Sequence, residues 1–282
     1  MITIGEYQTL TVARVSDLGY MLTDNKDEVL LHFKQAKNTY KEGDSVKVFI
    51  YADKAKRLTA TEAIVSATIE DAGFASVVEI LPGAGVFVNI NTPKDLLLSK
   101  DYLPYDERKW PNIGDKVFIR LKIKHDILTA KPLNRFDIKS IKSDLRYADN
   151  EQVEGYVCHF SEKGMGIVTK DIKYVFVPYT QLRGDYHMGE EVMVTITKET
   201  DNEYYGTLNQ HKEIQMVEDR EIILDYLRNH HGVMKLTAKS SAEEVEALLG
   251  MSRKAFKRAY GGLYKDELIT FDEEKTLLKD YK

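Results

Sequence analysis

The chain has 282 residues, of which 43% are apolar and 30% are charged, and its 45 acidic and 40 basic side chains give a net charge of −5. Dedicated duplex DNA-binding proteins usually contain a strongly basic domain, because phosphate neutralisation dominates their affinity, and this composition argues against one. The one cysteine, Cys158, excludes an internal disulfide framework and a zinc site built from cysteines, and it is typical of a reducing cytoplasm.

An internal repeat occurs three times along most of the chain. Each copy is marked by a Gly-Asp or Gly-Glu pair before an alternating apolar run. The pairs are Gly43-Asp44, Gly114-Asp115 and Gly189-Glu190. Their spacings of 71 and 75 residues are too long for a solenoid and are typical of a small domain that is used repeatedly.

Each repeat contains about five short strands with period-2 alternation and glycines where a strand bends, which is typical of a small closed barrel of the OB type. We therefore predict a multidomain, mostly β fold with three tandem five-stranded OB-type barrels and a C-terminal α+β domain. The predicted barrels span residues 1–64, 65–148 (with a connector) and 149–211, and the C-terminal domain spans 212–282.

Alternate side chains fill a closed barrel, and the others face outward. In the strand after each glycine pair the outward positions are predicted to be Lys47, Phe49 and Tyr51, then Phe118, Arg120 and Lys122, then Met193, Thr195 and Thr197. The connector at about 131–152 is expected to let the first two barrels move relative to the third. Because few residues follow Asn209 before the next helix, the third barrel and the C-terminal domain are expected to form one rigid unit.

The sequence of landmarks in each repeat resembles the RNA-binding repeat of ribosomal protein S-one. The second repeat matches best, through Gly85-Val86-Phe87-Val88 and Gly114-Asp115-Lys116-Val117. The first repeat has Met21 and the third has Gly166 where the pattern has Phe. The resemblance implies an RNA-binding barrel with an aromatic platform, from which the third repeat departs at Gly166.

The pattern changes to helical spacing at about residue 215. One helix is expected to end near Gly232, a second follows the capping box of Ser241 and Glu244, and a third follows Ser252. A hairpin is expected at 268–271 and 276–278. Three helices and a hairpin in this order are typical of a winged helix.

The third of these helices is predicted to carry a basic stripe. With Phe256 in the core, its opposite face presents Lys254, Arg258 and Lys265, with Lys257 beside them. A helix-turn-helix presents this element to nucleic acid, although a solvated face explains the stripe equally well. Gly261-Gly262 should cost about 1 kcal/mol each relative to alanine, so either something lies close to the backbone or the helix bends there.

Three such repeats followed by a winged helix resemble the conserved virulence factor B family of Gram-positive bacteria, over the whole chain. The resemblance implies a role in regulating bacterial gene expression, virulence factors included. We predict a non-enzymatic cytoplasmic protein that binds single-stranded or structured RNA. The sequence shows no signal peptide and no apolar stretch of about 20 residues for a membrane span. It also shows no histidine cluster with metal-ligand spacing, and we expect neither a metal nor a cofactor.

RNA contacts are assigned to rings that stack on bases and to cations near them. The candidate RNA-binding residues are Tyr20, His32 and Arg57 in the first repeat, Phe87, Arg120 and Lys122 in the second, and Lys254, Lys257, Arg258 and Lys265 in the winged helix. An ordinary strand-end histidine explains His32 equally well. Two alternatives stay open: a DNA-binding transcription regulator that acts through the winged helix, and a scaffold associated with the ribosome or polymerase.

Overall fold

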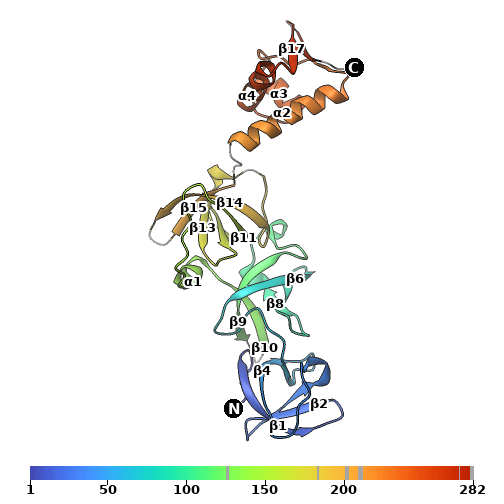
Figure 1. Ribbon diagram of the computed structural model, residues 1–282, viewed down its shortest axis with the longest axis vertical. Helices are drawn as coiled ribbons and strands as arrows, with labels where there is room; N and C mark the ends of the chain where they lie inside the picture. The colour runs from blue at the N-terminus through green and yellow to red at the C-terminus, as the bar shows by residue number, and fades with distance from the viewer. Residues whose placement is uncertain (125–126, 183, 201–202, 209–211, 273, 280–282) are drawn as a thin grey trace. The chain divides into compact units, whose positions relative to one another are not determined.

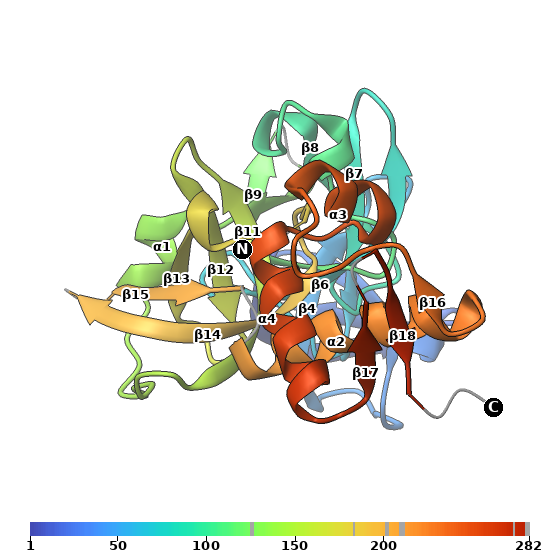
Figure 2. The ribbon, with the colours of Figure 1, turned by 90° about the horizontal axis from the view of Figure 1, so that it is seen from above.

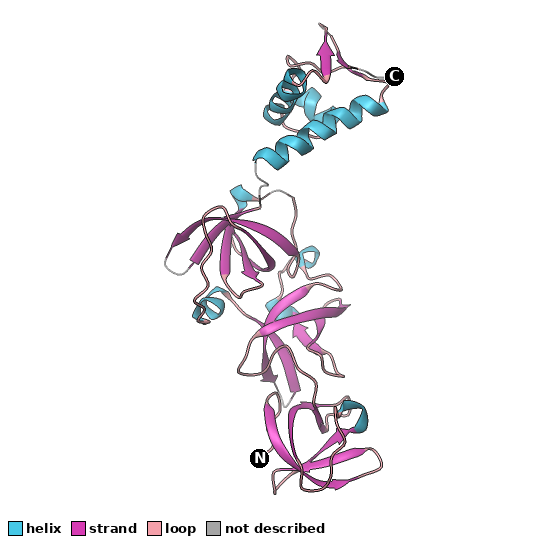
Figure 3. Cartoon of the chain, in the orientation of Figure 1, coloured by secondary structure: helices cyan, strands magenta, loops and turns pink. Residues whose placement is uncertain are grey.

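The computed structural model describes residues 1–124, 127–182, 184–200, 203–208, 212–272 and 274–279. The chain divides into two compact units, Met1–Leu208 and Asn209–Lys282. Strands build the first unit, and the longest helices lie in the second (Figures 1 and 3). The third barrel therefore groups with the first two barrels, and the expectation that it forms one unit with the C-terminal domain is wrong.

The first barrel is closed in the strand order β1-β2-β3-β5-β4. Its strands are β1 (Tyr7–Val15), β2 (Gly19–Thr23), β3 (Glu28–His32), β4 (Ser45–Ala52) and β5 (Leu58–Thr61). Alternating residues such as Leu22, Leu31 and Val48 fill the interior. Gly19 starts β2 because a Cβ there would lie 2.1 Å from the Leu31 carbonyl oxygen.

The second barrel has the same strand order, again closed. Its strands are β6 (Gly73–Leu81), β7 (Gly85–Asn89), β8 (Leu96–Ser99), β9 (Lys116–Lys124) and β10 (Ile127–Pro132). One parallel residue pair, Leu98 with Ala130, joins β8 to β10 and completes the circle. Short 3-10 turns, η2 (Lys100–Tyr102) and η3 (Glu107–Lys109), occupy the long connection between β8 and β9.

The third barrel repeats this order in β11-β12-β13-β15-β14. Its strands are β11 (Gln152–Phe160), β12 (Gly164–Thr169), β13 (Tyr174–Pro178), β14 (Glu191–Thr200) and β15 (Glu203–Thr207). A short helix, α1 (Arg135–Ser140), begins the connector before it and is capped by Asn134 and Asp137. Ile138 of this helix is buried against the outer face of the third barrel.

The first and second barrels meet through side chains that were expected to face solvent. Phe49 and Tyr51 are buried, with 0% and 6% of their surface exposed, in the same apolar cluster as the core of the second barrel. The Tyr7 ring packs edge-on against Phe49, and its hydroxyl donates to the Ala63 carbonyl at 2.9 Å. The two rings do not line their own barrel, but the expectation that they are free is wrong because the next barrel covers them.

The second and third barrels meet in the same way. Phe118 is 2% exposed, its ring centroid lies 4.9 Å from that of Phe74, and Phe74 lies 5.1 Å from Tyr156 of the third barrel. The expectation that Phe118 faces solvent is therefore also wrong. Lys122 on the same strand is exposed, as expected.

A histidine links the glycine-pair turns of these two barrels. His187 Nε2 lies 2.7 Å from Asp115 Oδ2, and its Nδ1 lies 3.0 Å from Glu190 Oε2. The Gly189 carbonyl also accepts from the Lys116 N–H at 3.3 Å. Apolar packing and polar contacts together join the three barrels into one unit, which the sequence did not predict.

The second unit has the element order of a winged helix (Figure 2). Its elements are α2 (Lys212–Asn229), β16 (Val233–Met234), α3 (Ala242–Leu249), α4 (Arg253–Lys265), β17 (Ile269–Phe271) and β18 (Thr276–Leu278). Ser241 and Glu244 form the predicted capping box, Gly250 ends α3 in the left-handed conformation, and Ser252 caps α4. Phe256 and Leu263 are buried in its core.

The mostly β multidomain fold with five-stranded barrels and a winged-helix arrangement is thus confirmed. Among the helices that the structure describes, none has the length and apolar character needed to cross a bilayer. Within the same described residues, no group of three or more histidine, cysteine or acidic side chains is arranged to hold a metal ion.

Candidate nucleic-acid interface

The common strand register gives each barrel an equivalent row of outward positions, which we call the barrel row. Successive members pair across neighbouring strands, as Met21 pairs with both Arg14 and Leu30. The exception is Leu97 and Thr129, which each precede a member of the Leu98–Ala130 pair. The rows are Arg14, Met21, Leu30, Thr59 and Tyr51 in the first barrel, Glu79, Phe87, Leu97, Thr129 and Lys122 in the second, and His159, Gly166, Phe176, Tyr205 and Lys198 in the third. The rows allow the candidate residues to be compared position by position.

Tyr20 does not present its ring to solvent. It precedes Met21 on β2, so strand alternation directs it away from the barrel row, and only 4% of its surface is exposed. Its ring packs edge-on against Phe33 and Tyr40 at 5.2 and 5.4 Å, and its hydroxyl accepts the Tyr40 N–H at 3.2 Å. The prediction that Tyr20 offers a stacking face is wrong, and Phe33 is the exposed ring of this group.

His32 and Arg57 both make local contacts in the first barrel. His32 Nδ1 accepts the Lys34 N–H at 3.1 Å and caps the short turn η1 (Phe33–Gln35). Arg57 is exposed, and its Nε and Nη2 donate to Asp53 Oδ2 at 2.9 and 2.7 Å. The Arg57 backbone N–H and guanidinium lower the pKa of the Asp53 carboxyl. Part of the Arg57 charge is therefore neutralised within its own turn.

In the second barrel, Phe87 is half-buried at the centre of the barrel row, between Glu79 and Leu97. Lys122 is exposed in the same row, but Leu97 and Thr129 lie between the two. Three strand steps separate Phe87 from Lys122 by roughly 14 Å along the sheet. Because the barrel closes with five strands, three steps carry the row more than halfway round it, so Phe87 and Lys122 are not neighbours on one face.

Arg120 is less available than Lys122. It lies two residues earlier on β9, opposite Lys131 of β10, and is only partly exposed. Its Nε is buried and has no hydrogen-bond partner among the described residues. The cross-strand neighbours of Phe87 are Glu79 and Leu97, so the grouping of Phe87 with Arg120 and Lys122 stays a prediction.

In the third barrel, aromatic side chains occupy different positions of the row. A Cβ on Gly166 would lie 2.4 Å from His159 Nδ1, so the imidazole fills the space that a side chain would take there. Phe176 and Tyr205 stand next in the row, partly exposed, with ring centroids 5.8 Å apart. The sequence analysis did not select these two residues. The alternation in Val175-Phe176-Val177 could have indicated that Phe176 faces outward.

The third barrel also holds polar groups that are partly or fully buried and electrostatically constrained. His159 stacks on Tyr174 at 5.7 Å, and burial, helped by Arg135, lowers the pKa of the imidazole. Burial raises the pKa of the Cys158 thiol to about 12, so the thiol is neutral and unreactive at neutral pH. Arg135 forms an ion pair with the buried Glu203. The arrangement supports a fixed surface rather than proton transfer or nucleophilic chemistry.

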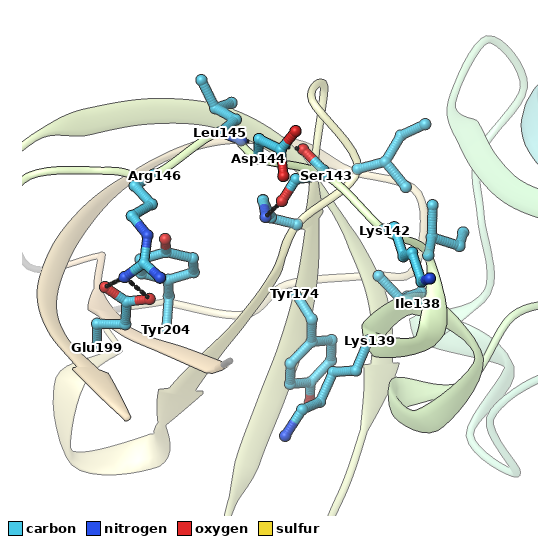
Figure 4. A pocket seen from close by; sticks show the side chains of 13 residues that line it. Ile138, Lys139, Lys142, Ser143, Asp144, Leu145, Arg146, Tyr174, Glu199 and Tyr204 are labelled. Atoms are coloured by element: carbon cyan, nitrogen blue, oxygen red, sulfur yellow. Dashed lines mark hydrogen bonds and ion pairs between the residues drawn. The ribbon is translucent and has the colours of Figure 1, made fainter. Parts of the chain in front are cut away.

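A cavity of about 370 Å³ lies between the connector and the third barrel (Figure 4). Two of its cations have local partners: Arg146 pairs with Glu199 at 3.3 Å, and Lys173 Nζ donates to the Ser143 carbonyl at 2.7 Å. Lys142 is exposed and makes no ion pair within the described residues. The lining is mainly polar, and the cavity is not part of the barrel row.

In the winged helix, three of the four candidate cations are exposed on α4. Lys254, Lys257 and Lys265 have no ion-pair partner in the described part of the chain. Arg258 instead donates from Nη2 to Asp219 Oδ2 of α2 at 2.8 Å, and its Nε is buried. The prediction that Arg258 belongs to the exposed stripe is wrong, because its charge is used to join α4 to α2.

Comparisons with known proteins match this architecture. Residues 4–62 match the model of the S1 domain, residues 72–127 match that of the CvfB first S1-like domain, and residues 221–278 match that of the CvfB-like winged helix domain. The chain is 31% identical over 265 residues to the uncharacterized protein YitL of Bacillus subtilis, covering 93% of this chain and 89% of that protein.

It is also 25% identical over 283 residues to conserved virulence factor B of Staphylococcus haemolyticus, covering 98% of this chain and 94% of the relative. Among solved structures, it is similar to a multidomain protein with nucleic acid binding domains from Streptococcus pneumoniae. The TM-score is 0.63, the identity is 25%, and 98% of each chain is covered.

Proposed function

Since this chain belongs to the conserved virulence factor B family, whose domains are of nucleic-acid-binding types, we propose that it binds single-stranded or structured RNA through three S1-like barrels and the winged helix. The third barrel is included in this proposal because it has the same strand order as the two that match S1 models. The protein acts as a binding protein in the bacterial cytoplasm and not as an enzyme.

One observation carries the proposal. Rings occupy equivalent outward rows in neighbouring barrels of one unit: Phe87 in the second barrel, and Phe176 with Tyr205 in the third. Each ring is partly exposed. An unpaired base stacked on such a ring contributes about 1 to 3 kcal/mol, which does not require a basic protein. This matters because residues 149–211 contain 5 basic and 11 acidic residues.

Joined barrels strengthen binding without stronger individual contacts. Once one base is stacked on a ring of one barrel, the rings of the next barrel meet the same RNA strand at a high effective concentration. The contacts at Phe118 and His187 hold the second and third rows in one unit, so this gain does not depend on a flexible linker. In this proposal, the protein regulates gene expression by binding to transcripts.

The test is a titration of a labelled single-stranded RNA oligomer with full-length Phe87→Ala and Tyr205→Ala variants. Each substitution should weaken binding by about 5- to 150-fold at fixed salt. Phe136→Ala is the matched control, since Phe136 is exposed on α1, outside the rows. Unchanged affinity in both row variants would contradict the proposal.

A second candidate function is duplex DNA binding through the winged helix, favoured by the exposed cations of α4. In that case duplex DNA should displace RNA from the protein. Charge reversal at Lys254 and Lys257 should then abolish DNA binding and leave the barrel-dependent RNA binding intact. Loss of RNA binding alone in this variant would argue against the DNA reading.

A further inference from the structure

The charge of the winged-helix domain is distributed unevenly. Residues 212–282 contain 13 basic and 14 acidic residues, so the domain as a whole is slightly acidic. Helix α4, with the sequence RKAFKRAYGGLYK, carries five cations and no acidic residue, and the four cations other than the paired Arg258 are exposed. Helix α3, with the sequence AEEVEALL, carries three acids and no cation. The positively charged face of α4, in a domain with a slightly negative net charge, is electrostatically complementary to an anionic ligand.

Gly261 interrupts this face without a reason in the fold. A Cβ built on it meets no atom within 4 Å, and the residue is exposed. Of the two glycines, only Gly262 has a neighbour, since a Cβ there would lie 3.7 Å from Arg220 Cδ, whereas nothing in the described part of the domain approaches Gly261. Glycine inside a helix costs about 1 kcal/mol relative to alanine, so the missing side chain leaves a notch at a cost to helix stability. Lys257, Tyr264 and Lys265 lie three or four residues away and border the notch.

Two exposed rings stand at the end of the same face. Tyr264 of α4 is 53% exposed, Phe271 of β17 is 47% exposed, and their centroids lie 5.2 Å apart. Phe271 also lies 6.0 Å from the buried Tyr260, which fixes the wing ring against the helix. Figure 2 shows β17 beside the C-terminal end of α4. Large apolar side chains in contact on an exposed surface are typical of a binding site.

We propose that this face binds an unpaired nucleotide of a single-stranded RNA, with the phosphate over Gly261 beside Lys257 and the base stacked on the Tyr264 ring, against which Phe271 packs at 51°. The inference rests on the RNA-binding function proposed above and specifies what the winged helix recognises. Stacking requires a free base face, which a paired duplex does not offer. The notch lets a sugar–phosphate backbone approach closer than any larger residue allows.

Local acidic groups leave the phosphate position accessible. Asp266 is paired with Arg220, Glu267 lies 3.7 Å from Lys279 Nζ, and Asp272 accepts backbone N–H groups of its own turn. Those backbone donors lower the pKa of Asp272. The acids thus lie beyond the helix, on the wing side, and the notch itself is bordered by lysines.

The experiment measures binding of a labelled single-stranded RNA and of a labelled DNA duplex to the full-length protein. Tyr264→Ala should weaken RNA binding by about 5- to 150-fold, and Tyr264→Phe should restore it, because a phenyl ring still stacks. Gly261→Leu should weaken RNA binding while raising the melting temperature of the second unit, since leucine is a better helix former. Leu248→Ala, an exposed apolar residue on α3, is the matched control.

The outcomes separate this inference from the one it rests on. If the wild type binds RNA and both Tyr264→Ala and Gly261→Leu bind it equally well, the platform is refuted and the barrel-based function stands. If the variants lose duplex binding as strongly as RNA binding, the face reads paired nucleic acid and the inference is wrong. If the wild type binds no RNA, the proposed function itself fails.

Discussion

Replacing Phe118 with alanine tests whether the second and third barrels depend on one another. Phe118 is 2% exposed and packs on Phe74, which in turn packs on Tyr156. Truncating a buried phenylalanine to alanine typically costs about 3 to 5 kcal/mol. In a unit of 208 residues this corresponds to a melting temperature lower by about 6 to 20 °C.

The same substitution should reduce RNA affinity although Phe118 is not in a barrel row. If the contact between the second and third barrels loosens, an RNA strand that is bound to one barrel row meets the other row at a lower effective concentration. Thermal unfolding and RNA titration of the full-length variant measure the two effects, and limited proteolysis between Leu133 and Tyr147 reports opening of the connector. Phe136→Ala removes a ring that is 78% exposed and should change stability by less than about 0.5 kcal/mol.

If Phe118→Ala changes stability no more than Phe136→Ala does, the two barrels do not stabilise one another through this ring. Stability could instead fall as calculated while RNA affinity stays at the wild-type level. That second result would mean that the two barrels bind independently of how they are joined.

Three further predictions concern single sites. Burial lowers the pKa of His159 below its ordinary 6.5, so the unfolded state takes up a proton more readily than the folded state. The free energy of unfolding should therefore fall as the pH drops below about 6.5. Urea titrations at several pH values measure this, and His159→Asn should make the dependence on pH weaker. Arg258→Ala leaves the buried Asp219 unpaired and should destabilise the winged helix by about 2 kcal/mol, whereas an equal effect from Lys254→Ala would contradict the assigned pairing. Cys158 should resist alkylation at pH 8 until urea unfolds the chain, and rapid labelling of the native protein would disprove its burial.

Local signals in the sequence were sufficient for the elements. The glycine pairs and alternating runs located the strands, and the side chains of Ser241 and Ser252 cap the helices where the sequence placed them. Each of these features depends on residues only a few positions apart. Period-2 alternation also separated the interior of a barrel from its outside correctly at Phe49 and Phe118.

What the outward residues contact could not be predicted in the same way. Phe49 is covered by the second barrel, and Phe118 by the third, through contacts between residues far apart in sequence. Tyr20 was assigned to the wrong face because its neighbour Met21 holds the outward position. The platform at Phe176 and Tyr205 needs the pairing of β13 with β15, a parallel contact between strands that are not consecutive.

The covered rings between the first two barrels also constrain how such a chain can change during evolution. Domains that are independent can be gained, lost or exchanged as cassettes. Removing the second barrel would expose Phe49 and Tyr51 to solvent and leave a hydrophobic surface patch that is prone to aggregation. A new arrangement of these domains would therefore also require polar replacements for those rings.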